Sequence, residues 1–69
     1  MAKKNKKLIK AREEKGISQF EAAKAIGIAP SMYTMLETGD RRGSDETKIK
    51  VANFFGLSVG YLFFNEDIT

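Results

Sequence analysis

The stretch ISQFEAAKAIGIAPSMYTMLE, residues 17–37, contains two short helical patterns that are separated by Gly27. Ser18 and Glu21 have the spacing of a capping box, in which free N–H groups at a helix start are satisfied. The second pattern opens at Pro30, a residue favoured in the first helical position because its missing N–H has no partner there. Gly27 can adopt a positive φ cheaply in a short turn. The stretch therefore predicts two helices joined by a tight turn.

The apolar positions of this stretch indicate how the two helices pack. Phe20, Ala23 and Ile26 recur at helical spacing in the first helix, and Tyr33 and Leu36 recur in the second. A small residue at position 23 allows the second helix to pack closely across the first. Such a pair is a helix-turn-helix, which presents the N-terminal end of its second helix outward.

The rest of the chain also has helical patterns. Residues Lys6 to Lys15 are rich in strong helix formers, and Gly16 suits the left-handed position after them. Ser44 is a good N-cap for a fourth helix, and Ser58 for a short fifth one. No alternating strand pattern of useful length is present, apart from a weak one at residues 61–64. We expect an all-α, compact five-helix fold in one domain, residues 1–69, with a flexible basic start at 1–5 and a C-terminal tail at 65–69.

The composition narrows the functional class. The chain has 69 residues and a net charge of +3, with no cysteine and no histidine, which excludes disulfides and thiolate metal sites. No apolar run approaches the ~20 residues of a membrane span, and no signal-peptide core follows the basic start. We expect a cytoplasmic protein without membrane, cofactor or metal. Without paired carboxylates at useful spacing, neither an enzyme nor a small-molecule substrate is expected.

Two longer segments carry a resemblance to a known family. LIKAREEKGISQFEAAKAIGIAPSMYTMLETGDRR, residues 8–42, resembles the helix-turn-helix of lambda repressor and Cro-like regulators. IKVANFFGLSVGYLF, residues 49–63, resembles the fourth and fifth helices of that family. The resemblance implies a lambda-repressor-like DNA-binding domain whose recognition helix enters the major groove of double-stranded DNA. The lysine-rich start suits a polyanion partner, although a solvated basic surface has the same composition.

The resemblance also implies roles for individual residues. Gln19 corresponds to a glutamine that contacts a DNA phosphate, although an exposed residue at a helix start has the same appearance. The loop after the recognition helix touches the DNA backbone in the family, which places Thr38, Arg41 and Arg42 near phosphates, or leaves them in a solvated loop. In the family, residues near the start of the recognition helix face the DNA. The corresponding residues of this chain are Ala29, Pro30, Ser31, Met32, Thr34 and Met35.

The side chains on this face differ from the commoner family pattern, in which Gln, Arg, Asn or Lys read bases. Ser31 hydrogen-bonds several bases and so specifies weakly by itself, and Thr34 adds a phosphate or base hydrogen bond. Met32 and Met35 offer only apolar contacts, and both are equally compatible with filling the core. Discrimination is therefore expected from thymine methyl groups, DNA shape and contacts made elsewhere.

Other positions concern packing. The resemblance pairs Arg12, late in the first helix, with Glu37 at the end of the third, as a structural ion pair that braces the recognition helix. Ala22 stands where relatives usually carry leucine, and Lys48 where they usually carry an apolar residue. The candidates to refill the lost volume are Phe20, Tyr33, Phe54 and Phe55.

The C-terminal aromatic residues suggest pairing between two copies. A core this small does not easily cover five phenylalanines, and leftover apolar surface marks an interface. In the family two copies pair around the fifth helix, which implies a homodimer through Tyr61, Phe63 and Phe64, with recognition helices ~34 Å apart. Alternatively, Phe63 closes the core of each copy, and Tyr61 and Phe64 form the contact between copies.

The leading hypothesis is a sequence-specific transcriptional regulator that acts as a dimeric repressor on a pseudo-palindromic operator. The alternative is a protein-interaction module on the same helical scaffold, for example an antitoxin-like partner-binding protein. The missing polar base-reading side chains keep that alternative open. Loss of binding after charge removal at Arg41 and Arg42, with a strong dependence on ionic strength, would favour DNA.

Overall fold

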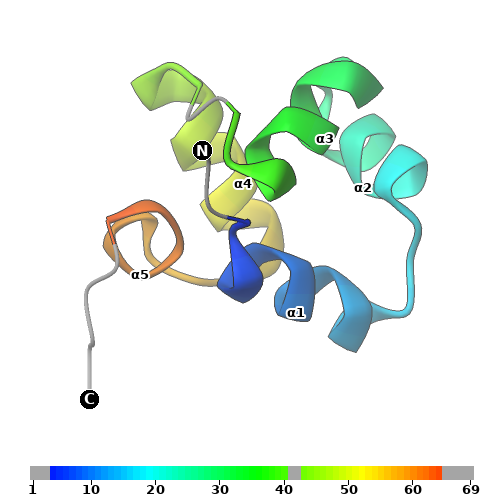
Figure 1. The fold of residues 1–69 in the computed structure, drawn as a ribbon, viewed down its shortest axis with the longest axis horizontal. Helices are drawn as coiled ribbons and strands as arrows, with labels where there is room; N and C mark the ends of the chain where they lie inside the picture. Colours follow the sequence, from blue (N-terminus) through cyan, green and yellow to red (C-terminus); the bar gives the residue numbers. More distant parts are fainter. Residues whose placement is uncertain (1–3, 41–42, 65–69) are drawn as a thin grey trace.

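The computed structural model describes residues 4–40 and 43–64, and within them the chain forms five helices and no strand (Figure 1). The predicted all-α, five-helix fold is confirmed. α4 contacts both α2 and α5, and α1 contacts α3 and α5, so the helices enclose one core. The helices are α1 (Lys6–Lys15), α2 (Gln19–Ile26), α3 (Pro30–Thr38), α4 (Asp45–Phe55) and α5 (Val59–Phe63).

Local capping explains where the helices begin and end. The Ser18 hydroxyl accepts a hydrogen bond from the Glu21 N–H, and the Glu21 carboxylate accepts one from the Ser18 N–H, so the predicted capping box is present. Ser44 and Ser58 cap α4 and α5 through their hydroxyls. Gly27 ends α2 with φ 92°, a left-handed backbone that residues with a side chain rarely adopt.

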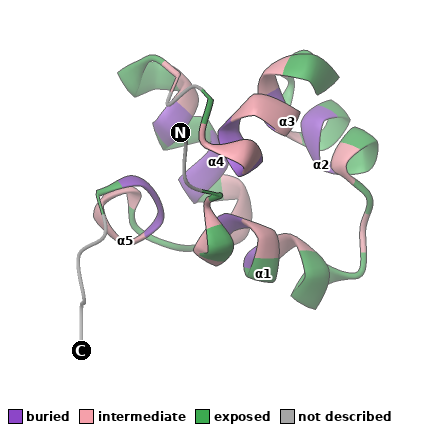
Figure 2. Cartoon of the chain, in the orientation of Figure 1, coloured by how far each residue is buried: buried purple, intermediate pink, exposed green. Residues whose placement is uncertain are grey.

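The core lies where the inner faces of the helices meet, as the buried segments in Figure 2 show. α2 and α3 make the most extensive contact between helices, and Ala22 and Ala23 on the α2 side have no exposed surface. These small side chains allow α3 to approach α2 closely. The buried hydrophobic cluster consists of Leu8, Ala22, Ala23, Tyr33, Leu36, Val51, Ala52, Leu62 and Phe63.

Phe20 lies outside this core, which corrects its place in the expected apolar pattern of α2. Its side chain is 61% exposed. At about 3.6 residues per turn, Phe20 lies about 110° around the helix from the direction shared by Ala22, Ala23 and Ile26. Phe20 therefore does not refill the volume that a leucine at position 22 would occupy. Among the other candidates, Tyr33 is fully buried and Phe55 packs against the core. Both therefore contribute apolar volume to the core.

Lys48 is buried although it carries a charge, with 8% of its surface exposed. Its Nζ lies 4.8 Å from the centre of the Phe64 ring and 3.9 Å from Asp45 Oδ1. A lysine in this position contributes its aliphatic stem to packing, while an aromatic face and a carboxylate balance the charge at its tip. The departure from an apolar residue at position 48 is therefore accommodated at the junction of α4 with the end of α5.

Candidate nucleic-acid interface

α3 has one face in the core and one face toward solvent. Tyr33 and Leu36 have 0% and 1% of their surface exposed, so they anchor the inner face. Ala29, Pro30 and Ser31, at the N-terminal end, are all exposed. Because the Ala29 N-cap provides no side-chain hydrogen bond, the first N–H groups of α3 remain available to an outside acceptor. The helix start thus offers small side chains and backbone donors to the surroundings.

The next residues of α3 are partly covered. Met32, Thr34 and Met35 all have intermediate exposure. None of the three belongs to the buried cluster, yet each has part of its surface against the protein. Among the described residues, the partly buried hydrophobic side chains that pack against the cluster do not include Met32 or Met35, so both lie outside the core with surface left for a ligand.

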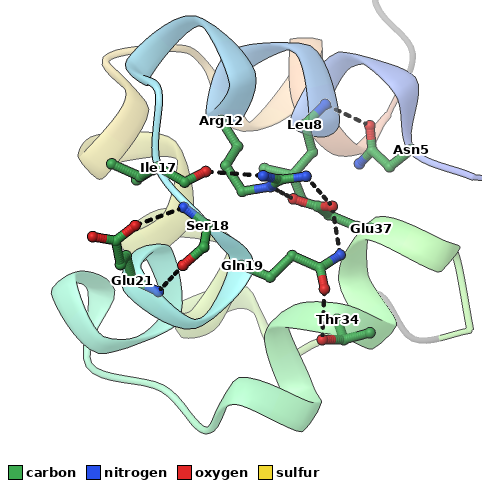
Figure 3. Close-up of polar contacts among 9 residues, drawn as sticks. All are labelled: Asn5, Leu8, Arg12, Ile17, Ser18, Gln19, Glu21, Thr34 and Glu37. Atoms are coloured by element: carbon green, nitrogen blue, oxygen red, sulfur yellow. Dashed lines mark hydrogen bonds and ion pairs between the residues drawn. The ribbon is translucent and has the colours of Figure 1, made fainter.

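An ion pair braces the C-terminal half of α3. Arg12 Nε lies 2.6 Å from Glu37 Oε2, Arg12 Nη2 donates to Glu37 Oε1 at 3.4 Å, and Nη1 donates to the Ile17 carbonyl oxygen at 2.9 Å (Figure 3). The Glu37 side chain is 2% exposed. Burial by itself would raise the pKa of Glu37, but hydrogen bonds from Arg12 and Gln19 outweigh it and lower the pKa. Glu37 therefore stays a carboxylate at neutral pH.

Gln19, the first residue of α2, joins this network through its side-chain amide. Its Nε2 donates to Glu37 Oε1 at 2.9 Å, and its Oε1 accepts a hydrogen bond from Thr34 Oγ1 at 3.4 Å (Figure 3). An amide nitrogen carries two hydrogens, so the bond to Glu37 leaves one N–H for another acceptor. The contact to Glu37 fixes which end of the amide faces the carboxylate. The sequence gives no local signal for this contact, because the partners lie in different helices.

Tyr33 contributes its whole side chain to the core beside this network. Its hydroxyl is buried beside Glu37 and Arg12, but no hydrogen bond of good geometry reaches it among the residues that the structure describes. Burial raises the pKa of the Tyr33 phenol strongly, and the neighbouring Glu37 carboxylate raises it further. The phenol is therefore neutral throughout the ordinary pH range.

The comparisons with known proteins agree with this geometry. A family model described as helix-turn-helix matches residues 8–62, which span α2 and α3 and most of the chain. The chain belongs to the Cro/C1-type helix-turn-helix family. It is accordingly a DNA-binding transcriptional regulator of the helix-turn-helix type. The resemblance inferred from the sequence is thus confirmed.

Two relatives from Bacillus subtilis strain 168 carry the same description, uncharacterized HTH-type transcriptional regulator. The chain is 40% identical to YqaF over 61 residues, which cover 88% of this chain and 78% of YqaF. It is 34% identical to YqaE over 59 residues, which cover 86% of this chain and 51% of YqaE, so it spans about half of that relative. No solved structure matches the chain.

The residues that follow α3 are only partly described. The Thr38 hydroxyl lies 3.2 Å from the Met35 carbonyl oxygen and 3.0 Å from Asp40 Oδ2, and can donate to either. Arg41 and Arg42, expected to contact phosphates, lie outside the described residues. Thr38 therefore helps to close the last turn of α3, whatever else it contacts.

The expected pairing residues differ in how much surface they offer. Phe63 is 8% exposed and belongs to the core cluster, whereas Phe64 is 49% exposed. Tyr61 is partly buried, and its ring lies 4.4 Å from Lys7 Nζ. Most of the Phe63 surface is therefore covered within one copy, and Phe64 has the largest area left for a contact.

Within the described part of the chain, no group of three or more His, Cys, Asp or Glu side chains has the arrangement of a metal site. In the same residues, no helix has the length and apolar character needed to cross a membrane.

Proposed function

We propose that this regulator is a dimeric, sequence-specific repressor that binds a pseudo-palindromic operator through the major groove. The observation that carries the proposal is the division of α3 into an anchored inner face and an exposed N-terminal end. Tyr33 and Leu36 hold the helix, while Ala29, Pro30 and Ser31 face solvent. A helix presented in this way fits the major groove, with its first residues at the base edges.

Direct base readout by this helix would be limited to weak and apolar contacts. Ser31 is the exposed hydrogen-bonding side chain at the helix start, and the Ala29 and Pro30 side chains offer carbon atoms alone. Met32 and Met35 extend the apolar surface toward thymine methyl groups. With no bidentate side chain in this set, we expect operator preference to depend strongly on T-rich steps and on DNA shape.

Contacts to the DNA backbone would set the register. Gln19 keeps one amide N–H beyond its bond to Glu37, and it stands at the start of α2, where free backbone N–H groups favour an anion. Thr34 and Thr38 supply hydroxyls, and Arg41 and Arg42 supply charge. These contacts would add affinity without reading sequence.

Pairing of two copies would complete the operator-binding unit. Phe64 is the exposed aromatic residue at the end of α5, and Tyr61, three residues earlier in the chain, has intermediate exposure. We assign Phe63 mainly to the core of each copy, with its edge at the interface. A two-fold pair would place the recognition helices about one DNA turn apart, ~34 Å. Residues 1–69 would act as one cytoplasmic domain without cofactor or catalytic activity.

The DNA part of the proposal is tested by selection from a randomised duplex pool. The wild type is compared with Ser31→Asp, which puts a negative charge at the exposed start of α3. Asn53→Asp is the matched control, because it makes the same charge change at an exposed position of α4. We expect the wild type and Asn53→Asp to enrich one pseudo-palindrome and Ser31→Asp to enrich none. Equal enrichment by all three proteins would refute the assignment of α3.

Pairing is tested by sedimentation equilibrium without DNA. Phe64→Asp removes an aromatic side chain that is 49% exposed at the proposed interface, and Phe20→Asp removes one that is 61% exposed on α2. Both variants lose one phenylalanine and gain one negative charge. We expect Phe20→Asp to remain dimeric and Phe64→Asp to become monomeric. Dimers in both variants, or a monomeric wild type, would contradict pairing through α5.

The alternative, a protein-interaction module, is favoured by the exposed apolar side chains of Phe20 and Ile49, which are 61% and 51% exposed. Exposed apolar groups of this size are available for a protein partner. If no duplex is enriched at low salt, this alternative takes the place of operator binding.

A further inference from the structure

Asn5 joins the ends of three helices. Its side-chain oxygen accepts a hydrogen bond from the Leu8 N–H at 3.1 Å and so caps the start of α1 (Figure 3). Its side-chain nitrogen donates to the Leu62 carbonyl oxygen of α5 at 2.8 Å. Its backbone N–H donates to the Glu37 carbonyl oxygen of α3 at 2.7 Å. One residue thus satisfies a free N–H at one helix start and a free carbonyl at each of two helix ends.

The two carbonyl groups belong to helices with different tasks in the proposed function. Glu37 lies in the last turn of α3, whose N-terminal end would enter the DNA groove. Leu62 lies in α5 between Tyr61 and Phe63, where two copies would pair. Asn5 therefore forms a direct hydrogen-bonded link between the recognition helix and the proposed pairing helix of the same copy.

In a dimer that pairs through α5, the orientation of α3 relative to α5 determines the separation of the two recognition helices. Glu37 lies seven residues after Pro30, the first residue of α3, so the N-terminal end of the helix is about 10 Å from the Asn5 junction. A reorientation of about 10° at the junction would move that end by about 2 Å. Two-fold symmetry would double the change in separation between the recognition helices, to roughly the rise of one base pair, ~3.4 Å.

We propose that Asn5 is a positioning residue that sets the preferred spacing of DNA half-sites by fixing the orientation of α5 relative to α3. The inference rests on the proposed function, in which a dimer reads two half-sites. Asn5 itself acts through Glu37 and Leu62 and does not contact the DNA. Its effect should therefore appear in the spacing preference and not in the affinity for one half-site.

Two substitutions remove the link to α5 while they keep the cap of α1. Asn5→Asp retains an acceptor for the Leu8 N–H but replaces the amide donor by an oxygen that repels the Leu62 carbonyl. Asn5→Ser also retains a cap, without the added charge and without the reach of the amide. Ser44→Asp is the control, because it makes the same charge change as Asn5→Asp at an N-cap whose hydroxyl bonds Thr47 in its own helix.

The experiment measures dissociation constants on duplexes that carry the two selected half-sites at spacings from about two base pairs shorter to two longer than the operator. A duplex with one half-site is included. We expect wild type and Ser44→Asp to share one sharp optimum. For both Asn5 variants we expect the optimum to shift or flatten, with binding at the original spacing weakened at least ~5-fold and half-site binding within ~2-fold of wild type.

The outcomes separate this inference from the proposed function. Folded Asn5 variants with the wild-type spacing profile would overturn the role of Asn5 and leave the dimeric repressor intact. A wild type without any spacing optimum would overturn the dimeric operator complex and the inference together. Circular dichroism and thermal unfolding establish folding, and if neither variant folds, Asn5 has a structural role alone and the proposal is refuted.

Discussion

Removing the Arg12 guanidinium should destabilise the fold far more than removing an ordinary surface charge. The Glu37 carboxylate is 2% exposed, and in Arg12→Ala it would keep the hydrogen bond from Gln19 but lose both from Arg12. Breaking a buried pair from one side costs about 3–5 kcal/mol, because the remaining charge stays desolvated. Since the Arg12 side chain is 17% exposed, we expect the lower end of that range, about 3 kcal/mol.

This loss is large for a chain of this size. At 0.05–0.15 kcal/mol per residue, 69 residues have a free energy of unfolding of roughly 3.5–10 kcal/mol. A loss of about 3 kcal/mol would therefore lower the melting temperature by roughly 12–24 °C. Urea unfolding followed by circular dichroism gives the free energy directly.

Two further variants make the test specific. Lys50→Ala breaks the Lys50–Glu46 pair, whose side chains are 49% and 79% exposed, and it should cost about 0.5 kcal/mol or less. Replacing both Arg12 and Glu37 by methionine removes the buried charges together, so it should be more stable than Arg12→Ala. If Arg12→Ala costs no more than Lys50→Ala, the pair is screened by solvent and does not brace α3.

Three other predictions concern buried polar groups. Hydrogen bonds outweigh burial and hold the pKa of Glu37 below its ordinary value of 4.5, so its stabilising contribution is complete above that pH and is lost as the pH falls through the lowered pKa. Acid unfolding should show this loss in the wild type and not in Glu37→Gln. If the free energy of unfolding falls equally steeply with pH in both proteins, the prediction is contradicted. Tyr33→Phe should leave the unfolding free energy unchanged or raise it by up to ~1 kcal/mol, because the buried hydroxyl has no hydrogen-bond partner in the described part of the chain. If Tyr33→Phe instead lowers the free energy of unfolding by more than ~1 kcal/mol, the Tyr33 hydroxyl forms a hydrogen bond to Glu37. Lys48→Met keeps the buried stem and should stay within ~1 kcal/mol of wild type, whereas Lys48→Ala should cost about 1–2 kcal/mol through lost packing. Equal urea midpoints for the two Lys48 variants would show that the charge matters more than the stem.

The parts of the fold that sequence predicts are those determined within a few residues. The Ser18–Glu21 capping box and the left-handed Gly27 need no knowledge of the rest of the chain, and both are present as predicted. Phe20 shows the limit of periodicity, because three apolar residues at helical spacing do not reveal which side of the stripe faces the core. That direction depends on α3, which packs on Ala22 and Ala23 instead.

The contacts that organise the candidate site join residues that are far apart in the sequence. Gln19 and Glu37 are 18 positions apart, and Asn5 and Leu62 are 57 apart. Such hydrogen bonds form only after the helices have packed, so neither propensity nor spacing predicts them. Asn5 belongs to residues 1–5, which the sequence predicts as a flexible basic start, and its hydrogen bonds to Glu37 and Leu62 depend on two helix ends that meet there in space.

Most of the groups that hold α3 lie in its C-terminal half, with Tyr33 as the buried residue nearer its start, whereas the groups that it presents lie at the N-terminal end. Glu37 and Leu36, in the C-terminal half, have their side chains in the ion pair and the core, whereas Pro30 and Ser31 at the N-terminal end have exposed side chains. Substitutions at Ser31 should therefore change DNA preference with little effect on stability, since an exposed position away from the core tolerates replacement within about 0.5 kcal/mol. Substitutions at Glu37 should lower the stability and also weaken DNA binding, because the exposed residues at the start of α3 move with the helix that Glu37 holds. Under the proposed function, a change in operator preference would therefore need no change in the core.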